Sequence, residues 1–277
     1  MTTMSTVWDR TTEFVGENIA ALTPIVLLGM FAPVALIGNL MPLMGPSGVV
    51  GNAVVGGLIV LLSLLSNWGA IAVTALALDP AAGRGVAIRN ANRRFLAVIG
   101  INLIVLVILF LLFAPAFIGL SLSGIPMNQA GAAQPSLDQI NGPAVLFSSL
   151  YTLVLLPVLL WLIARLSVIN AAVVAERRGF GVFARAFALT RGLALRIMGV
   201  ILLYLIVSQV AGLATRMVAG TVFGLLSSSD GPVSLAAIMT SVVVAVVSTI
   251  FSVLAVAFLA KLYLATRDAR AAHVEVA

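Results

Sequence analysis

Six stretches of the sequence are apolar for long enough to cross a membrane as a helix, and this feature limits the fold more than any other. A helix needs about 20 apolar residues to span the hydrocarbon core. The six stretches cover residues 22–41, 53–78, 95–120, 144–169, 197–226 and 233–260. Only 9% of all residues are charged, against roughly a quarter in soluble domains. The sequence therefore predicts an all-α polytopic membrane bundle of six transmembrane helices, with residues 1–277 forming a single transmembrane domain and residues 266–277 a polar C-terminal tail.

Basic side chains are confined to alternate connections between these stretches. All but two of the 15 basic residues lie near the N-terminus, in the intervals 79–94 and 170–196, or after residue 260. Because Lys and Arg favour the cytoplasmic side of a membrane, both termini are predicted to be cytoplasmic. A single lysine among the basic residues is typical of a GC-rich bacterial genome, so the predicted location is the bacterial inner membrane.

The net charge of +6 follows from this topology. It requires no nucleic-acid partner, whereas clustered basic residues are attracted to anionic lipid heads. The predicted partners are therefore membrane lipids, with a second membrane protein as a further possibility.

A short pattern recurs before two of the predicted pairs of spans. Gly-x-Gly-Val-x-x-Arg is found at residues 83–89 and 179–185. Both segments, like residues 7–19, are amphipathic when wound at about 100° per residue. We therefore predict three repeats of a cytoplasmic interfacial helix followed by two spans, at about 1–79, 80–175 and 176–265. The predicted residues of the cytoplasmic interface are Arg89, Arg93, Arg165, Glu176, Arg185 and Arg191.

The first amphipathic segment differs from the other two in the sign of its charge. Asp9, Glu13 and Glu17 follow one another at i+4 spacing on its polar face, whereas the other two segments carry arginines. Opposite charges on these segments could pair into a layer beneath the bundle. Alternatively, each polar face is solvated, since exposed ion pairs contribute only about 0–1 kcal/mol.

Three polar residues inside the predicted spans, Asn67, Gln209 and Arg216, are candidates for a site in the membrane. Gln209 shares a helix face with Arg216, and Ser208 and Gly212 precede Arg216 at i+4 spacing. Small and weakly polar residues at this spacing usually mediate helix packing in lipid, and an arginine near a span end can snorkel to the interface. The alternative is a polar cleft for a lipid head group, in which Arg216 binds phosphate as a planar donor.

The residues of common catalytic sites are missing from the sequence. Cysteine is absent, and the one histidine, His273, lies in the polar tail. The predicted spans also place no carboxylate at mid-membrane depth, where coupled transporters commonly use one. Because nucleophiles, general bases and metal sites need several such groups together, we predict a protein that is not an enzyme, with no catalytic residue, cofactor or metal.

Residues 165–192 carry the pattern of a known family. Arg165 lies late in a span, Glu176 and Gly179 follow an apolar run, and Thr190 and Gly192 end the segment. This pattern resembles the bacterial glycerophosphoryl diester phosphodiesterase membrane-domain family. An alanine replaces the usual proline of the run, and the expected serine position holds Ala186 or Phe187. The resemblance implies a membrane module without the catalytic domain, and it supplies no catalytic residue.

The function expected from these features is that of a non-enzymatic accessory or structural protein of the inner membrane, acting in envelope maintenance or lipid organisation. The alternative is a transporter or flippase-like protein for a lipid or small amphipathic molecule, using a cleft between the second, fifth and sixth spans. A transporter should present Asn67, Gln209 or Arg216 to a continuous polar cavity. A scaffold should bury them in tight helix contacts.

Overall fold

The computed structural model describes residues 3–45, 48–124, 140–176, 181–226 and 234–275, and these residues form helices and short connections without any strand. Six helical segments are long and apolar enough to cross a membrane. This confirms the predicted all-α bundle with six candidate spans. The spans are Ile19–Leu43, Val50–Leu78, Pro80–Ser121, Gly142–Ala175, Ala194–Leu225 and Leu235–Ala271.

The N-terminal helix α1 (Met4–Glu17) is separate from the first span. The side chain of Thr3 accepts a hydrogen bond from the Thr6 amide and caps its start. At its end, Asn18 leaves the helical conformation, and α2 (Ile19–Val26) begins in a new direction. The buried face of α1 includes Val7 and Phe14 and packs on the last helix of the chain. One of the predicted amphipathic segments is therefore a distinct short helix.

The first span is irregular because two prolines interrupt it. It consists of α2, the π-helical turn η1 (Leu27–Phe31), α3 (Ala32–Leu40) and the 3₁₀ turn η2 (Met41–Leu43). Pro24 lies inside α2, and Pro33 has no amide hydrogen for the carbonyl one turn earlier. The second span, α4 (Val49–Leu78), crosses η1 so closely that a Cβ built on Gly69 would lie 2.5 Å from the Gly29 carbonyl oxygen. Only glycine fits at that crossing.

The segment before the third span differs from the predicted arrangement. A 3₁₀ turn, η3 (Pro80–Ala82), leads directly into α5 (Gly83–Ser121), which runs unbroken through the predicted interfacial segment and the span. Residues 84–114 contain no proline, so nothing removes a backbone hydrogen bond between the basic turns and the apolar turns. The three-repeat arrangement thus stays a prediction, because this unit lacks a separate interfacial helix.

The remaining spans are α6 (Gly142–Leu166) with its continuation α7 (Ile169–Ala175), α9 (Ala194–Leu226) and α10 (Leu235–Glu275). Between α7 and α9 lies the short helix α8 (Gly181–Leu189), which is separated from α9 by a turn with Gly192 at φ +82°. Helix α10 continues through most of residues 266–277, so the predicted polar tail is helical as far as Glu275.

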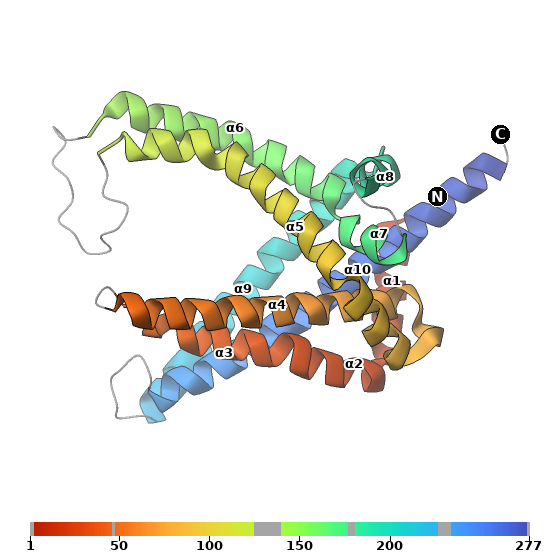
Figure 1. Ribbon diagram of the computed structural model, residues 1–277, viewed down its shortest axis with the longest axis horizontal. Helices are drawn as coiled ribbons and strands as arrows, with labels where there is room; N and C mark the ends of the chain where they lie inside the picture. The colour runs from red at the N-terminus through yellow and green to blue at the C-terminus, as the bar shows by residue number, and fades with distance from the viewer. Residues whose placement is uncertain (1–2, 46–47, 125–139, 177–180, 227–233, 276–277) are drawn as a thin grey trace.

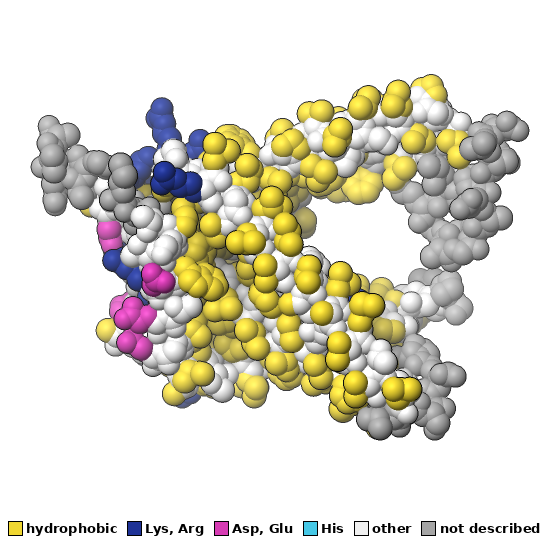
Figure 2. All heavy atoms as spheres, turned by 180° about the vertical axis from the view of Figure 1, so that it is seen from behind, with side chains coloured by type: hydrophobic (Ala, Val, Ile, Leu, Met, Phe, Trp, Pro, Cys, Tyr) yellow, Lys and Arg dark blue, Asp and Glu magenta, His cyan; other side chains and the backbone are white. Residues whose placement is uncertain are grey.

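The spans converge at one end of the molecule and diverge at the other. Figure 1 shows α1, α7, α8 and the last part of α10 gathered at one end, while the α5–α6 pair splays away from α3, α4, α9 and α10 at the opposite end. The charged side chains gather at the converging end, and the surface between the diverging arms is hollowed (Figure 2). We call these the charged end and the open end.

The buried core belongs to the charged end. It consists of residues from α1, α2, η1, the last turns of α4, the first half of α5, the α6–α7 junction, α8, the first turn of α9 and the second half of α10. Much of this core is alanine and valine, and small side chains allow helices to approach closely in lipid. Helix α9 by contrast exposes most of its length.

Candidate functional site

A polar groove runs between α9 and α10 in the open half of the molecule. It encloses about 280 Å³. Its lining residues come from both helices and are Tyr204, Ser208, Gln209, Gly212, Leu213, Arg216, Val244, Val247, Ser248, Phe251 and Ser252. We call this the α9–α10 groove.

Helix periodicity places the polar residues of α9 along this groove. Ser208, Gly212 and Arg216 follow at i+4 spacing, which keeps them on one face. Arg216 lies 22 residues after Ala194, or about 33 Å along the helix from its charged end. Tyr204 lies about 15 Å along the same helix, and its ring meets Phe251 edge to face at 6.1 Å. The groove therefore extends from mid-membrane depth toward the open end.

The groove presents its donors without protein partners. Gln209 and Arg216 are both exposed, and neither side chain has a hydrogen bond or ion pair within the described part of the chain. The hydroxyl of Ser208 donates to the Leu205 carbonyl at 3.1 Å, and that of Ser252 to the Ser248 carbonyl at 2.8 Å. These serines thus turn oxygen lone pairs to the groove, while Arg216 and Gln209 supply N–H donors. The combination suits an anionic group that carries hydroxyl or ammonium hydrogens.

The groove opens on the side where the α5–α6 pair diverges. Ile201 and Leu205 of α9 share an apolar cavity of about 210 Å³ with Ile163 of α6. Ser208 and Gly212 lie seven residues further along the same face. The α9–α10 groove therefore continues the α6-facing side of α9 along the helix.

Asn67 does not join Gln209 and Arg216. It lies in a separate cavity of about 60 Å³ between α4, α5, α7 and α10. Its amide donates to the Ser63 carbonyl of its own helix at 2.9 Å. Two further asparagines, Asn102 and Asn170, line that cavity, and sequence reasoning missed both. An asparagine inside an otherwise apolar stretch is the signal that could have found Asn102.

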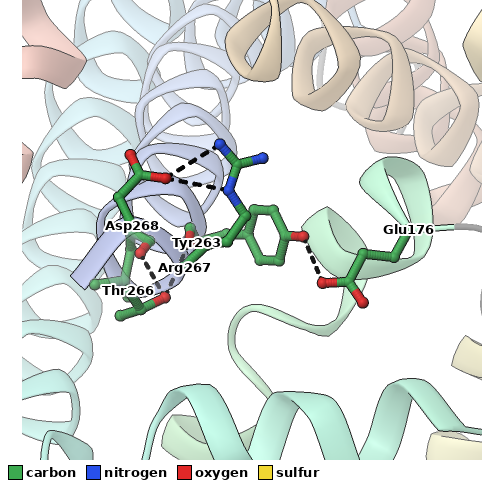
Figure 3. Close-up of polar contacts among 6 residues, drawn as sticks. Glu176, Tyr263, Thr266, Arg267 and Asp268 are labelled. Carbon is green, nitrogen blue, oxygen red and sulfur yellow. Dashed lines mark hydrogen bonds and ion pairs between the residues drawn. The ribbon is translucent and has the colours of Figure 1, made fainter. Parts of the chain in front are cut away.

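A second cluster of polar contacts ties the charged end together. The Arg185 Nε donates to Glu176 Oε1 at 2.9 Å, and the Tyr263 hydroxyl donates to the same oxygen at 2.8 Å. Figure 3 shows Tyr263 of α10 pointing at Glu176, which immediately follows α7. Tyr263 is fully buried. The carboxylate therefore holds α8 and α10 to the end of α7, a role that sequence reasoning did not assign to Tyr263.

Arg165 is part of the same end of the molecule. Its guanidinium lies 5.4 Å from the Trp161 ring centre and 5.9 Å from that of Phe187, and its Nη1 donates to the Phe187 carbonyl at 3.2 Å. The hydroxyl of Thr190 bonds to the Ala186 carbonyl at 2.8 Å and the Arg165 carbonyl at 3.3 Å. Cation–π contacts and hydrogen bonds of this kind anchor α8 on α6.

The predicted residues of the cytoplasmic interface separate into two groups. Arg165, Glu176 and Arg185 take part in the contacts above. Arg89, Arg93 and Arg191 are exposed at the charged end instead. None of the carboxylates of α1 forms an ion pair with arginines of α5 or α8 in the part of the chain that the structure describes. The described residues also contain no group of three metal-ligating side chains.

No protein-family model, curated protein or solved structure matches this chain. The resemblance of residues 165–192 to the glycerophosphoryl diester phosphodiesterase membrane-domain family therefore stays a prediction. The contacts made by Arg165, Glu176 and Thr190 give those residues a structural reason to occur together.

Proposed function

We propose that this protein is a multi-pass protein of the bacterial inner membrane that binds phospholipid and organises it, as a non-enzymatic accessory protein of the envelope. The observation that carries the proposal is Arg216, which lies with Gln209 in the α9–α10 groove and has no hydrogen bond or ion pair among the described residues. An arginine buried in tight helix contacts would indicate a role in helix packing alone. Here its donors point to a space between two spans, where lipid is the surrounding solvent.

The chemistry of the groove matches a phospholipid head. A guanidinium offers two parallel N–H donors to a phosphate, and such charge-assisted bonds are stronger than neutral ones. The serine oxygens can accept hydrogen bonds from a hydroxyl or ammonium group of the same head group. Exposed apolar side chains of α9, among them Met217 and Val218, continue beside the polar line and suit acyl chains.

Orientation and family belong to the same proposal. Arginines at the charged end support cytoplasmic termini by the positive-inside rule. In that orientation Arg216 lies toward the periplasmic leaflet. Membership of the glycerophosphoryl diester phosphodiesterase membrane-domain family agrees with an accessory role and rests on the motif at residues 165–192.

A transporter or flippase-like role is the second candidate, and the hollow between the diverging arms favours it (Figure 2). Transport needs a polar path through the membrane. Among the described residues, the α9–α10 groove and the cavity at Asn67 are separate. Lipid organisation therefore accounts better for the geometry than transport.

Retention of lipid tests the proposal. Wild type and the R216A/Q209A variant would be purified in mild detergent, and bound phospholipid counted by native mass spectrometry. Loss of a charge-assisted bond of about 1.5 kcal/mol predicts about tenfold weaker retention. R93A removes another exposed arginine, from the charged end, and serves as the matched control. Equal retention by wild type and R216A/Q209A would refute the proposal.

The orientation has its own test. A reporter active only in the cytoplasm should be inactive when fused after Asp138 and active when fused to the C-terminus. The reverse result would place Arg216 in the cytoplasmic leaflet and overturn the assigned orientation.

A further inference from the structure

A second groove, at the charged end, is lined by both positively and negatively charged side chains. It lies between α1, η3 and α10 and has a volume of about 220 Å³. Its lining residues are Arg10, Glu13, Phe14, Glu17, Asn18, Pro80, Lys261, Leu264 and Asp268. We call this the α1–α10 groove. It is far along α10 from the α9–α10 groove and shares no residue with it.

The opposite charges in the α1–α10 groove are held apart. Arg10 precedes Glu13 by three residues, a spacing at which opposite charges on a helix commonly pair. No ion pair joins Arg10 or Lys261 to either glutamate in the described part of the chain. The side chains of Arg10, Glu13 and Glu17 nevertheless line the same groove as Lys261. Two cations and two carboxylates thus line one groove without forming ion pairs with each other.

Packing keeps Lys261 in this position. Its Nζ lies 4.6 Å from the centre of the Phe14 ring, and Phe14 is buried between α1 and α10. A cation over an aromatic face is stabilised there, so the ammonium is held beside the carboxylates rather than against them. Asp268, the remaining acid of the groove, pairs with Arg267 at 3.1 Å. The charges left to a ligand are those of Arg10, Lys261, Glu13 and Glu17.

The position of the groove places it at the membrane surface. Helix α1 buries one face on α10 and exposes its acidic face, as a helix at the interface does. Trp8 of α1 is half exposed and contacts Phe258 at 6.3 Å between ring centres, and exposed tryptophans favour the head-group level. A lipid head is therefore the molecule most available to this groove.

We infer that the α1–α10 groove binds the head group of a zwitterionic phospholipid in which a phosphate is joined to a primary ammonium, as in an ethanolamine phospholipid. Lys261 and Arg10 take the phosphate, and Glu13 and Glu17 take the ammonium. An anionic head without an ammonium would leave both carboxylates facing its negative charge. The groove has a volume of about 220 Å³, a size that suits a single head group.

Competition between two lipids tests this inference. The full-length protein would be placed in nanodiscs containing ethanolamine and glycerol phospholipids with the same acyl chains, then released and analysed by native mass spectrometry. Wild type should retain the ethanolamine lipid preferentially. In E13Q/E17Q this retention should fall about tenfold, the effect of losing about 1.4 kcal/mol, while retention of the glycerol lipid is unchanged. D9N removes a carboxylate of the same helix outside the groove and should behave as wild type.

Reversing the charge of the two glutamates distinguishes a change in lipid binding from a loss of folding. E13K/E17K replaces both carboxylates of α1 in the groove with ammonium groups, so its preference should change toward the anionic glycerol lipid. Equal retention of both lipids by wild type, unchanged retention by E13Q/E17Q, or a parallel loss of both lipids in that variant would overturn the inference.

The result is independent of the α9–α10 groove. R216A should keep the ethanolamine preference even where it loses other lipid. A normal R216A together with a defective E13Q/E17Q would reject lipid binding by the α9–α10 groove and support the α1–α10 groove.

Discussion

The two halves of helix α4 differ sharply although both are apolar. Toward the charged end, residues 71–77 are all buried. Toward the open end, Val50, Val54 and Leu61 are 60–78% exposed. Water cannot explain the difference, because lipid solvates both halves equally well. In a membrane, burial follows from close packing and interhelical polar contacts rather than from hydrophobicity.

The same contrast separates the two ends of the whole molecule. Small side chains such as Ala77, Ala172 and Ala260 are fully buried where the helices converge. At the open end, α6 and α9 present leucines and valines to their surroundings. The charged end is therefore closely packed, whereas the open end leaves apolar side chains of α6 and α9 exposed.

Removing a large core side chain should have the greatest effect. Leu76 is fully buried at the charged end, and L76A should lower the free energy of unfolding by about 2–4 kcal/mol through the cavity it leaves. L153A removes the same atoms from a residue that is 65% exposed on α6, and it should change stability by less than about 0.5 kcal/mol. Unfolding in mixed detergent micelles measures both. Similar losses in the two variants would abolish the distinction between the ends.

Crowding the crossing of the first two spans should come next. In G69A the new methyl group would meet the Gly29 backbone, and overpacking of this kind costs about 1–3 kcal/mol. Gly57 lies on the open half of the same helix with nothing within 4 Å of a built Cβ. G57A should therefore be neutral or slightly stabilising, because alanine is the better helix former. A G69A protein as stable as wild type would show that the crossing is looser than described.

A smaller effect is expected for the Tyr263 hydroxyl. Y263F removes its 2.8 Å hydrogen bond to Glu176 and leaves the ring in place. The expected loss is about 1.5 kcal/mol, at the lower end of the range for a hydrogen bond to a charged group. The Arg185–Glu176 pair remains in this variant, so α8 should stay folded. Stability should be measured in the same micelles, and an unchanged value would remove the hydroxyl from the network of the charged end.

The smallest effect concerns the open end. The Asn39 amide of α3 donates to the Ser241 hydroxyl of α10 at 2.6 Å. Polar contacts between membrane helices average about 0.6 kcal/mol, so S241A should lower stability by about that amount. An effect larger than that of Y263F would mean that the open end, too, depends on polar contacts.

The predicted site residues show how far sequence reasoning extends. Gln209 and Arg216 share a face because helix periodicity alone brings residues seven apart together. Asn67 is also polar, which is why the sequence groups it with them. It lies in a different cavity because its helix, α4, packs against α5 and α7. The link between Tyr263 and Glu176 spans 87 positions, and no local pattern encodes it.

Apolar length and the spacing of charges determined, from the sequence alone, that this chain forms helices, how many candidate spans it has and which ends of them carry charge. Those properties are local, since they depend on the rise of a helix and on the transfer of side chains into lipid. Only the tertiary structure decided which apolar faces are buried, where the spans diverge and which charges surround the α1–α10 groove. Lipid accepts every apolar face alike, so contacts between helices select among them.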